Sequence, residues 1–108
     1  MNKNSSNGQN AAMVSYLTLL GALIAMSMNS HVQHPFARFH IRQAFGIHLL
    51  FHAFAILVSN YLGFISFGIL WLVYLILWGH GFWNAIQGKQ TLTPIVGSYF
   101  QKWFTFIN

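Results

Sequence analysis

The sequence predicts an all-α fold: an integral membrane helical bundle of three transmembrane helices plus a C-terminal amphipathic interfacial helix. The first observation behind it is composition, because 56% of the 108 residues are hydrophobic and 5% are charged, whereas an ordinary soluble domain carries about 25% charged residues. The second is the 46-residue stretch 43–88, which contains no Asp, Glu, Lys or Arg. A water-soluble protein of this composition would expose large apolar patches, which soluble monomers avoid.

The ionisable side chains exclude several classes of catalysis. The chain has no Asp, Glu or Cys. It therefore lacks the carboxylates of glycosidase pairs and hard-cation sites, and the thiols of disulfides and iron–sulfur ligation. We expect no enzymatic activity. The net charge of +5 comes from Lys3, Arg38, Arg42, Lys89 and Lys102, a thin distribution that fits membrane topology and not a nucleic-acid-binding patch.

Residues 1–10 are expected to form a polar N-terminal tail, followed by a single membrane domain over 11–108. The first span is predicted at about 11–28, an uncharged run of 18 residues. At about 1.5 Å per residue this run reaches roughly 27 Å, just enough to cross a bilayer core.

The uncharged stretch 43–88 is too long for one span and predicts two spans with a tight turn between them. The turn is expected at 59–63, a polar break that contains Gly63. This places the second span at about 42–60 and the third at about 64–86. Gly88 is the expected C-cap of the third helix.

The last segment predicts a helix at about 94–107, with Thr93 as its N-cap and Pro94 in its first position. Its apolar residues recur with helical spacing and leave Lys102 on the other face. The segment is too short to cross a bilayer, so we expect an interfacial helix whose Lys102 and Trp103 meet the membrane surface. The alternative is a surface helix packed on the bundle.

Orientation follows from the cations. Three spans would place the first loop and the C-terminal tail on one side of the membrane, with four of the five cations, and only Lys3 on the other side. Because Lys and Arg are enriched in cytoplasmic loops, we expect the first loop and the C-terminus in the cytoplasm and the N-terminus outside.

The sharpest local feature is the segment 34–44, which joins the first loop to the second span. Arg38 and Arg42 are four residues apart and share a helix face, from which both side chains can reach lipid phosphates. We interpret the segment as a partner- or lipid-binding surface formed by Pro35, Phe36, Arg38, Phe39, His40, Arg42 and Gln43. The alternative is simple anchoring by positive charge.

Histidines inside the spans are the other candidates for a site, because ionisable residues in a membrane are costly and often functional. His48 and His52 share one helix face at positions i and i+4, which makes them candidate ligands of a transition metal or haem. The alternatives are a proton relay and hydrogen bonding across helices. The main expectation is that the chain holds no cofactor.

The segment 34–45 also resembles a known motif, Pro-Phe-x-Arg-Phe-His-x-Lys/Arg-Gln-Ala, of a family of small bacterial membrane proteins of unknown function. That family is related to the import component of the chloroplast inner-envelope translocon, whose plastid members take part in protein import. The segments 83–89 and 92–97 resemble the family's closing pattern, so that the resemblance covers roughly 31–100. It implies a multi-pass protein of the bacterial inner (cytoplasmic) membrane with a link to protein transport.

Together these features predict a non-enzymatic small membrane subunit, an accessory or structural component of a larger membrane complex. Its expected partners are membrane lipids and other integral membrane subunits. One alternative is a small transporter or channel component with a polar path of His48, His52, Asn60, His80 and Asn84. Another is a haem- or metal-binding membrane anchor that uses His48 and His52.

Overall fold

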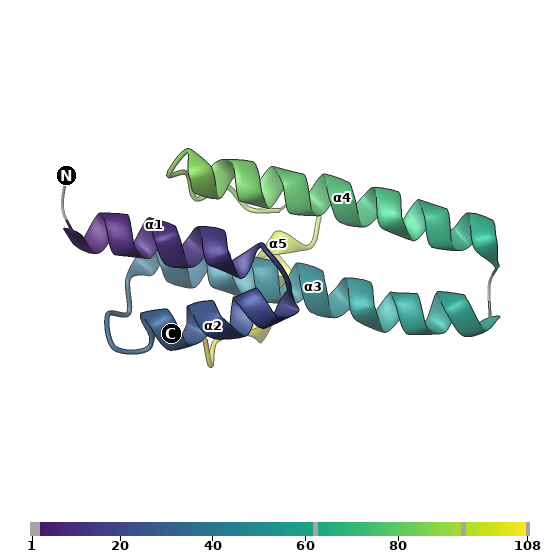
Figure 1. Cartoon of the computed structure of the whole chain (residues 1–108), viewed down its shortest axis with the longest axis horizontal. Coiled ribbons are helices and arrows are strands. Elements are labelled where there is room, and N and C mark those ends of the chain that lie inside the picture. Colours follow the sequence, from purple (N-terminus) through teal and green to yellow (C-terminus); the bar gives the residue numbers. More distant parts are fainter. Residues whose placement is uncertain (1–2, 62, 94, 108) are drawn as a thin grey trace.

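The computed structural model describes residues 3–61, 63–93 and 95–107. Within these residues the chain is all-helical and has no strand. The elements are α1 (Lys3–Ser15), α2 (Leu19–Asn29), α3 (Pro35–Tyr61), α4 (Phe64–Ile86) and α5 (Gly97–Trp103) (Figure 1). The all-α part of the predicted fold is therefore confirmed.

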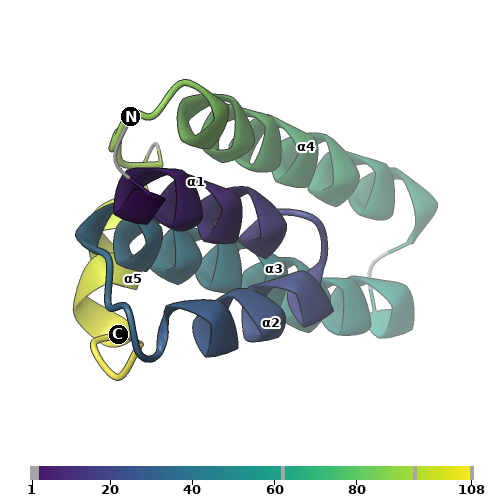
Figure 2. The same ribbon diagram turned by 60° about the vertical axis from the view of Figure 1, so that its left-hand side comes forward.

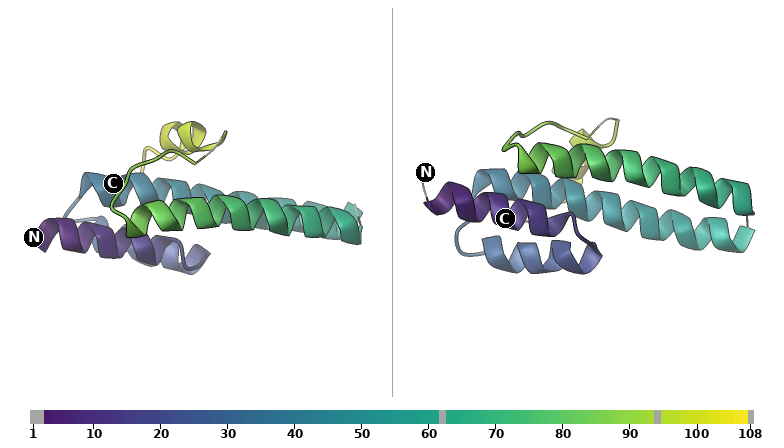
Figure 3. Two further views of the ribbon diagram at one scale, coloured as in Figure 1. Left: turned by 90° about the horizontal axis from the view of Figure 1, so that it is seen from above. Right: turned by 45° about the horizontal axis from the view of Figure 1, so that its top comes forward.

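The two longest helices, α3 and α4, are antiparallel, and the shorter helices pack against them. We call the end where α1 and α3 begin and α2 and α4 end the basal end, and the end with the α3–α4 turn the distal end (Figure 1). The shorter helices α1 and α2 lie along the basal half only (Figure 2). Helix α5 also lies near the basal half, on the opposite face of the α3–α4 pair from α1 and α2 (Figure 3).

The first predicted span is wrong, because 11–28 is not one helix. Helix α1 ends at Ser15 and α2 begins at Leu19, so the two helices fold back on each other. With 13 and 11 residues, they rise about 20 and 17 Å, less than the roughly 30 Å of a bilayer core. The break occurs because Thr18 is extended and its Oγ1 accepts a hydrogen bond from the Gly21 amide at 3.0 Å, which is the geometry of an N-cap.

The structure thus contains two helices long and apolar enough to cross a membrane within the described residues, not three. Helix α3 begins at Pro35 and not near 42, because proline is well suited to the first position of a helix. Helix α4 coincides with the predicted span 64–86.

The two glycines predicted to punctuate the long helices do so. Gly63 opens α4 with φ of 94° and Gly88 follows its end with φ of 74°. At that end the amide of Lys89 donates to the Asn84 carbonyl at 2.8 Å and that of Gly88 to the Ala85 carbonyl at 3.2 Å. This pair of bonds is a Schellman motif, which needs a left-handed residue where Gly88 stands.

The C-terminal helix is shorter than predicted. Helix α5 covers Gly97–Trp103 and its N-cap position is Val96, whereas Pro94, the predicted first residue, lies outside the described residues. Thr93 does not cap it, because the Thr93 hydroxyl donates to Gln43 Oε1 at 2.7 Å instead. The ring of Phe100 lies directly against Gly46 of α3 and leaves no room for a Cβ at that position. Helix α5 therefore packs directly on the bundle, while Tyr99 and Trp103 remain exposed.

The core occupies the basal half. One cluster of buried residues comprises Ala12, Tyr16, Phe36, Ala44, Ile47, Ala85 and Phe100, and another comprises Ala11, Ala25, Ala37, Ile41 and Ile107. In the distal half no third helix of the described residues lies beside α3 and α4 (Figure 3). Large apolar side chains are accordingly exposed there, with Phe64 at 91% and Ile65 at 78%.

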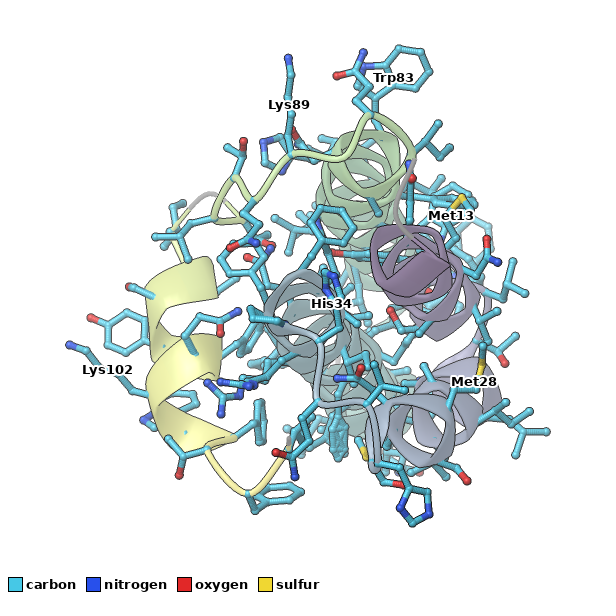
Figure 4. The ribbon with its side chains drawn as sticks, turned by 90° about the vertical axis from the view of Figure 1, so that its left-hand side faces the viewer. Met13, Met28, His34, Trp83, Lys89 and Lys102 are labelled. Atoms are coloured by element: carbon cyan, nitrogen blue, oxygen red, sulfur yellow. The ribbon has the colours of Figure 1, made fainter. Side chains whose placement is uncertain are left out.

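Helix α1 begins at the basal end, not opposite the first loop as three spans would require. Gln9 Nε2 of α1 donates to the Ile86 carbonyl at the end of α4, at 2.7 Å. Gly8 lies against the ring of His34 in the loop before α3. Figure 4 views this end along the helices, with His34 near the centre and Lys89 and Lys102 extending outward.

Candidate functional site

Helix α3 carries polar side chains into the basal core. His40, Gln43 and His48 are fully buried there, although burying an unpartnered polar group is costly. We call these three residues and the groups that they bond the buried polar layer. Its chemistry depends on where each hydrogen bond goes.

His40 connects α1 to the end of α4. Its Nε2 lies 2.6 Å from the carbonyl oxygen of Lys89, and its Nδ1 lies 2.8 Å from the Tyr16 hydroxyl. A carbonyl only accepts hydrogen bonds, so Nε2 carries a proton. Burial raises the pKa of the Tyr16 phenol, so the hydroxyl keeps its proton and can donate to Nδ1. The imidazole therefore bridges two segments that are far apart in the sequence.

His48 repeats this arrangement two turns further along α3. Its Nε2 donates to the Ser15 carbonyl at 3.1 Å, and its Nδ1 lies 3.0 Å from the Tyr74 hydroxyl of α4. The indole Nε1 of Trp78 donates to the neighbouring carbonyl of Tyr16. The last carbonyls of a helix have no partner within the helix, so the buried end of α1 is capped by side chains from α3 and α4.

Gln43 holds the segment that follows α4. Its Oε1 accepts hydrogen bonds from both the amide and the hydroxyl of Thr93, and its Nε2 donates to the Thr91 carbonyl at 3.2 Å. An added Cβ on Gly97 would lie 2.6 Å from the same Oε1. The connection between α4 and α5 is thus fixed to α3 by one amide side chain.

The two arginines of the 34–44 segment bind main-chain carbonyls. Arg42 donates from Nε and Nη2 to the Ile107 carbonyl at 3.1 and 3.0 Å, and from Nη2 to the Thr105 carbonyl at 3.3 Å. Arg38 donates from Nη2 to the Gln33 carbonyl at 3.2 Å. The Arg42 guanidinium therefore secures the segment that follows α5.

The other predicted surface residues divide between the core and the surface. Phe36 is buried, and the rings of Phe36 and Phe39 flank the His40 imidazole with centroids 4.7 and 5.2 Å away. Pro35 is exposed at the start of α3. Lys102 and Trp103 are exposed on α5. The motif is thus brought together in space, but its polar groups mostly bond the protein itself.

The predicted metal candidates do not form a ligand set in this structure. Both ring nitrogens of His48 are engaged by Ser15 and Tyr74, and His52 Nδ1 donates to the His48 carbonyl at 2.9 Å. Among the described residues, no three His, Cys, Asp or Glu side chains are grouped to hold a metal ion. Instead, the His48 ring bonds the end of α1 and Tyr74 of α4, and the His52 ring bonds the main chain of its own helix.

Sequence reasoning missed the partners of the buried histidines. Tyr16, Tyr74 and Trp78 have large apolar rings with one polar atom each, and such rings usually find a hydrogen-bond partner when buried. This preference could have pointed to these three residues as partners of the histidines. A sequence alone does not show which histidine faces which ring.

Comparison with models of protein families, with curated proteins and with solved structures finds no match for this chain.

Proposed function

We propose that this chain is a non-enzymatic integral membrane protein that acts as an accessory or structural subunit of a larger membrane complex. The observation that carries the proposal is the buried polar layer. His40, Gln43 and His48 all bond main-chain groups at the ends of other helices or in the loops between them. Their polar atoms serve to hold the fold together.

The surface of α4 supports a membrane location. Only 6% of its apolar 18-residue window is buried inside the protein, against 39% for α3. An exposed apolar face of this kind is covered by lipid or by another helix. The exposed aliphatic residues Ile65 and Ile76 lie on that face.

The cations and the α1–α2 hairpin support a revised topology. Helix α1 begins at the basal end, and α4 ends there. Arg38 and Lys89 lie at the same end. The positive-inside rule assigns that basal end to the cytoplasm. The α1–α2 hairpin then enters the inner membrane from the cytoplasm and returns without crossing, which its capped, buried end permits.

The transporter alternative has less support. Asn60 Nδ2 donates to the Ile56 carbonyl at 2.8 Å, and Asn84 Nδ2 to the His80 carbonyl at 2.7 Å. Each of these amides bonds its own helix one turn back, as His52 does. A role in protein translocation is supported only by the resemblance of the 34–45 segment to the family motif.

Co-purification tests the proposal. The tagged full-length chain is extracted from its own membranes in mild detergent, run on a native gel and analysed by mass spectrometry. We expect integral membrane partners in fixed stoichiometry, lost in an Ile65→Trp/Ile76→Trp variant of α4 and retained in a Leu23→Trp variant of the exposed face of α2. A monomeric chain without partners would contradict the subunit assignment.

A further inference from the structure

An apolar hollow of about 300 Å³ lies between the distal parts of α3 and α4. Its walls include Ile47, Leu50 and Phe54 from α3 and Ile69, Val73 and Leu77 from α4. The hollow is open on one side. It lies mostly beyond the basal core, where α1 has already ended and α5 does not reach (Figure 3).

Aromatic rings keep the two walls joined across the hollow. Phe51 of α3 stacks on Tyr74 of α4 with ring centroids 4.1 Å apart, and Trp71 packs edge-on against Phe51 at 4.8 Å. Both stacked rings belong to the lining. The hollow is therefore a formed feature of the α3–α4 pair.

The lining does not suit water. A volume of this size has room for about ten waters, each of which needs two to four polar partners. The polar side chains of the lining are Ser66 and Tyr74, and the Tyr74 hydroxyl is already engaged with His48 Nδ1. The occupant must therefore be apolar.

Volume and length together fit a hydrocarbon chain. A dry apolar cavity of about 150 Å³ holds a benzene molecule, so a hollow twice as large has room for about a dozen carbons. Along α4 the lining runs from Ser66 to Leu77, about 16 Å at 1.5 Å per residue. That length is close to half of the roughly 30 Å hydrocarbon core, which is the depth of one leaflet.

We infer that this hollow binds one acyl chain of a diacyl phospholipid whose headgroup lies at the distal membrane surface. The inference rests on the membrane location of the proposed function. The distal leaflet follows from Ser66, which stands two residues after the start of α4. No Lys or Arg occurs between 43 and 88, and Asn60 bonds its own helix, so recognition depends on the chain and not on the headgroup.

Native mass spectrometry of the full-length chain tests the inference. We expect one phospholipid per chain on the wild type after purification in mild detergent. Val73→Trp and Leu50→Trp fill the hollow from its two walls and should lower the lipid-bound fraction at least tenfold. Their controls are the adjacent exposed residues outside the lining, as Leu72→Trp and Leu49→Trp, which should retain the lipid.

A second measurement does not depend on variants. Delipidated wild type is incubated with dioleoyl phosphatidylethanolamine, or with dihexanoyl phosphatidylethanolamine, whose chains are too short to run the length of the hollow. We expect the bound mass and a rise in thermal stability with the first lipid only. A wild type without lipid, equal retention by all four variants, an isoprenoid adduct, or a second protein chain in place of lipid would overturn the inference.

Alkaline carbonate extraction separates this result from the proposed function. A chain that is released from membranes by carbonate contradicts the membrane location itself. A chain that remains in the membrane but carries no phospholipid contradicts only the acyl-chain site.

Discussion

His48 Nε2 donates a hydrogen bond to the Ser15 carbonyl oxygen 3.1 Å away, and this contact ends helix α1 inside the protein. His48, in the fourth turn of α3, thus supplies the hydrogen-bond donor that a carbonyl in the last turn of α1 lacks within its own helix. We expect His48→Phe to lower the free energy of unfolding by about 1–3 kcal/mol, the cost of a buried polar group without a partner. Thermal unfolding in detergent measures the change.

His52 is the matched control for that substitution. It lies one turn further along the same helix, is exposed, and bonds only the backbone of α3. His52→Phe should change the free energy of unfolding by less than about 0.5 kcal/mol, as surface substitutions usually do. Equal losses in both variants would show that His48 does not cap α1.

The contact of the Tyr16 hydroxyl with His40 Nδ1 predicts energetic coupling between the two residues. Tyr16→Phe and His40→Gln are measured singly and together. Because the two side chains share one hydrogen bond, the double variant should lose less stability than the sum of the single losses. Residues in direct contact typically show coupling between about 0.5 and 3 kcal/mol. Strict additivity would contradict the assigned bond.

The approach of Tyr16 to α4 predicts that Gly81 tolerates no side chain. An added Cβ on Gly81 would lie 2.5 Å from the Tyr16 ring, whereas Gly79 has nothing within 4 Å. Gly81→Ala should therefore destabilise by about 1–3 kcal/mol through overpacking. Gly79→Ala should be neutral or should stabilise the helix by up to about 1 kcal/mol. The reverse order in thermal unfolding would exclude the observed packing of α1 on α4.

The start of α1 at the basal end predicts a labelling pattern. The chain has no cysteine, so single-cysteine variants Asn10→Cys, Gln90→Cys and Ser59→Cys each carry one reactive thiol at an exposed position. A membrane-impermeant maleimide should label the first two from the cytoplasmic side and the third from the opposite side. Labelling of positions 10 and 59 from the same side would restore the three-span topology.

The hydrogen bonds of Arg42 to the Thr105 and Ile107 carbonyls predict that their loss makes the segment after α5 less stable locally. Arg42→Met should speed hydrogen exchange at the amides of Phe104 and Ile107, which bond within the C-terminal segment. We expect at least a tenfold change confined to that segment. Arg38→Met, which removes a bond to Gln33 instead, should leave those amides unchanged, and equal effects of the two variants would contradict the role of Arg42.

Much of the helical architecture was predictable because the signals were local. The helix at 64–86 and its closing Gly88 depend on composition and on a turn that glycine favours, and the structure confirms both. The start of α3 at Pro35 also follows a general rule, because proline favours the first position of a helix. The apolar pattern nevertheless led us to predict a start near residue 42. These features do not require knowledge of any distant contact.

The break between α1 and α2 could not be predicted, because its partners are distant in the sequence. Nothing in an uncharged run of 18 residues shows that His48 and Trp78 will cap a helix end at Ser15 and Tyr16. The same limit applies to the candidate site. The 34–44 segment was predicted to form a partner- or lipid-binding surface, but the tertiary contacts turn Gln43 and His40 inward.

The capped end of α1 also bears on the order of biogenesis. Helix α1 is synthesised before α3 and α4, yet the groups that cap it belong to these two later helices. Until those helices are in place, the hairpin cannot enter hydrocarbon without exposing bare carbonyls. In the proposed membrane topology, the α1–α2 hairpin therefore takes its final position only after the α3–α4 pair has inserted, although it precedes that pair in the sequence.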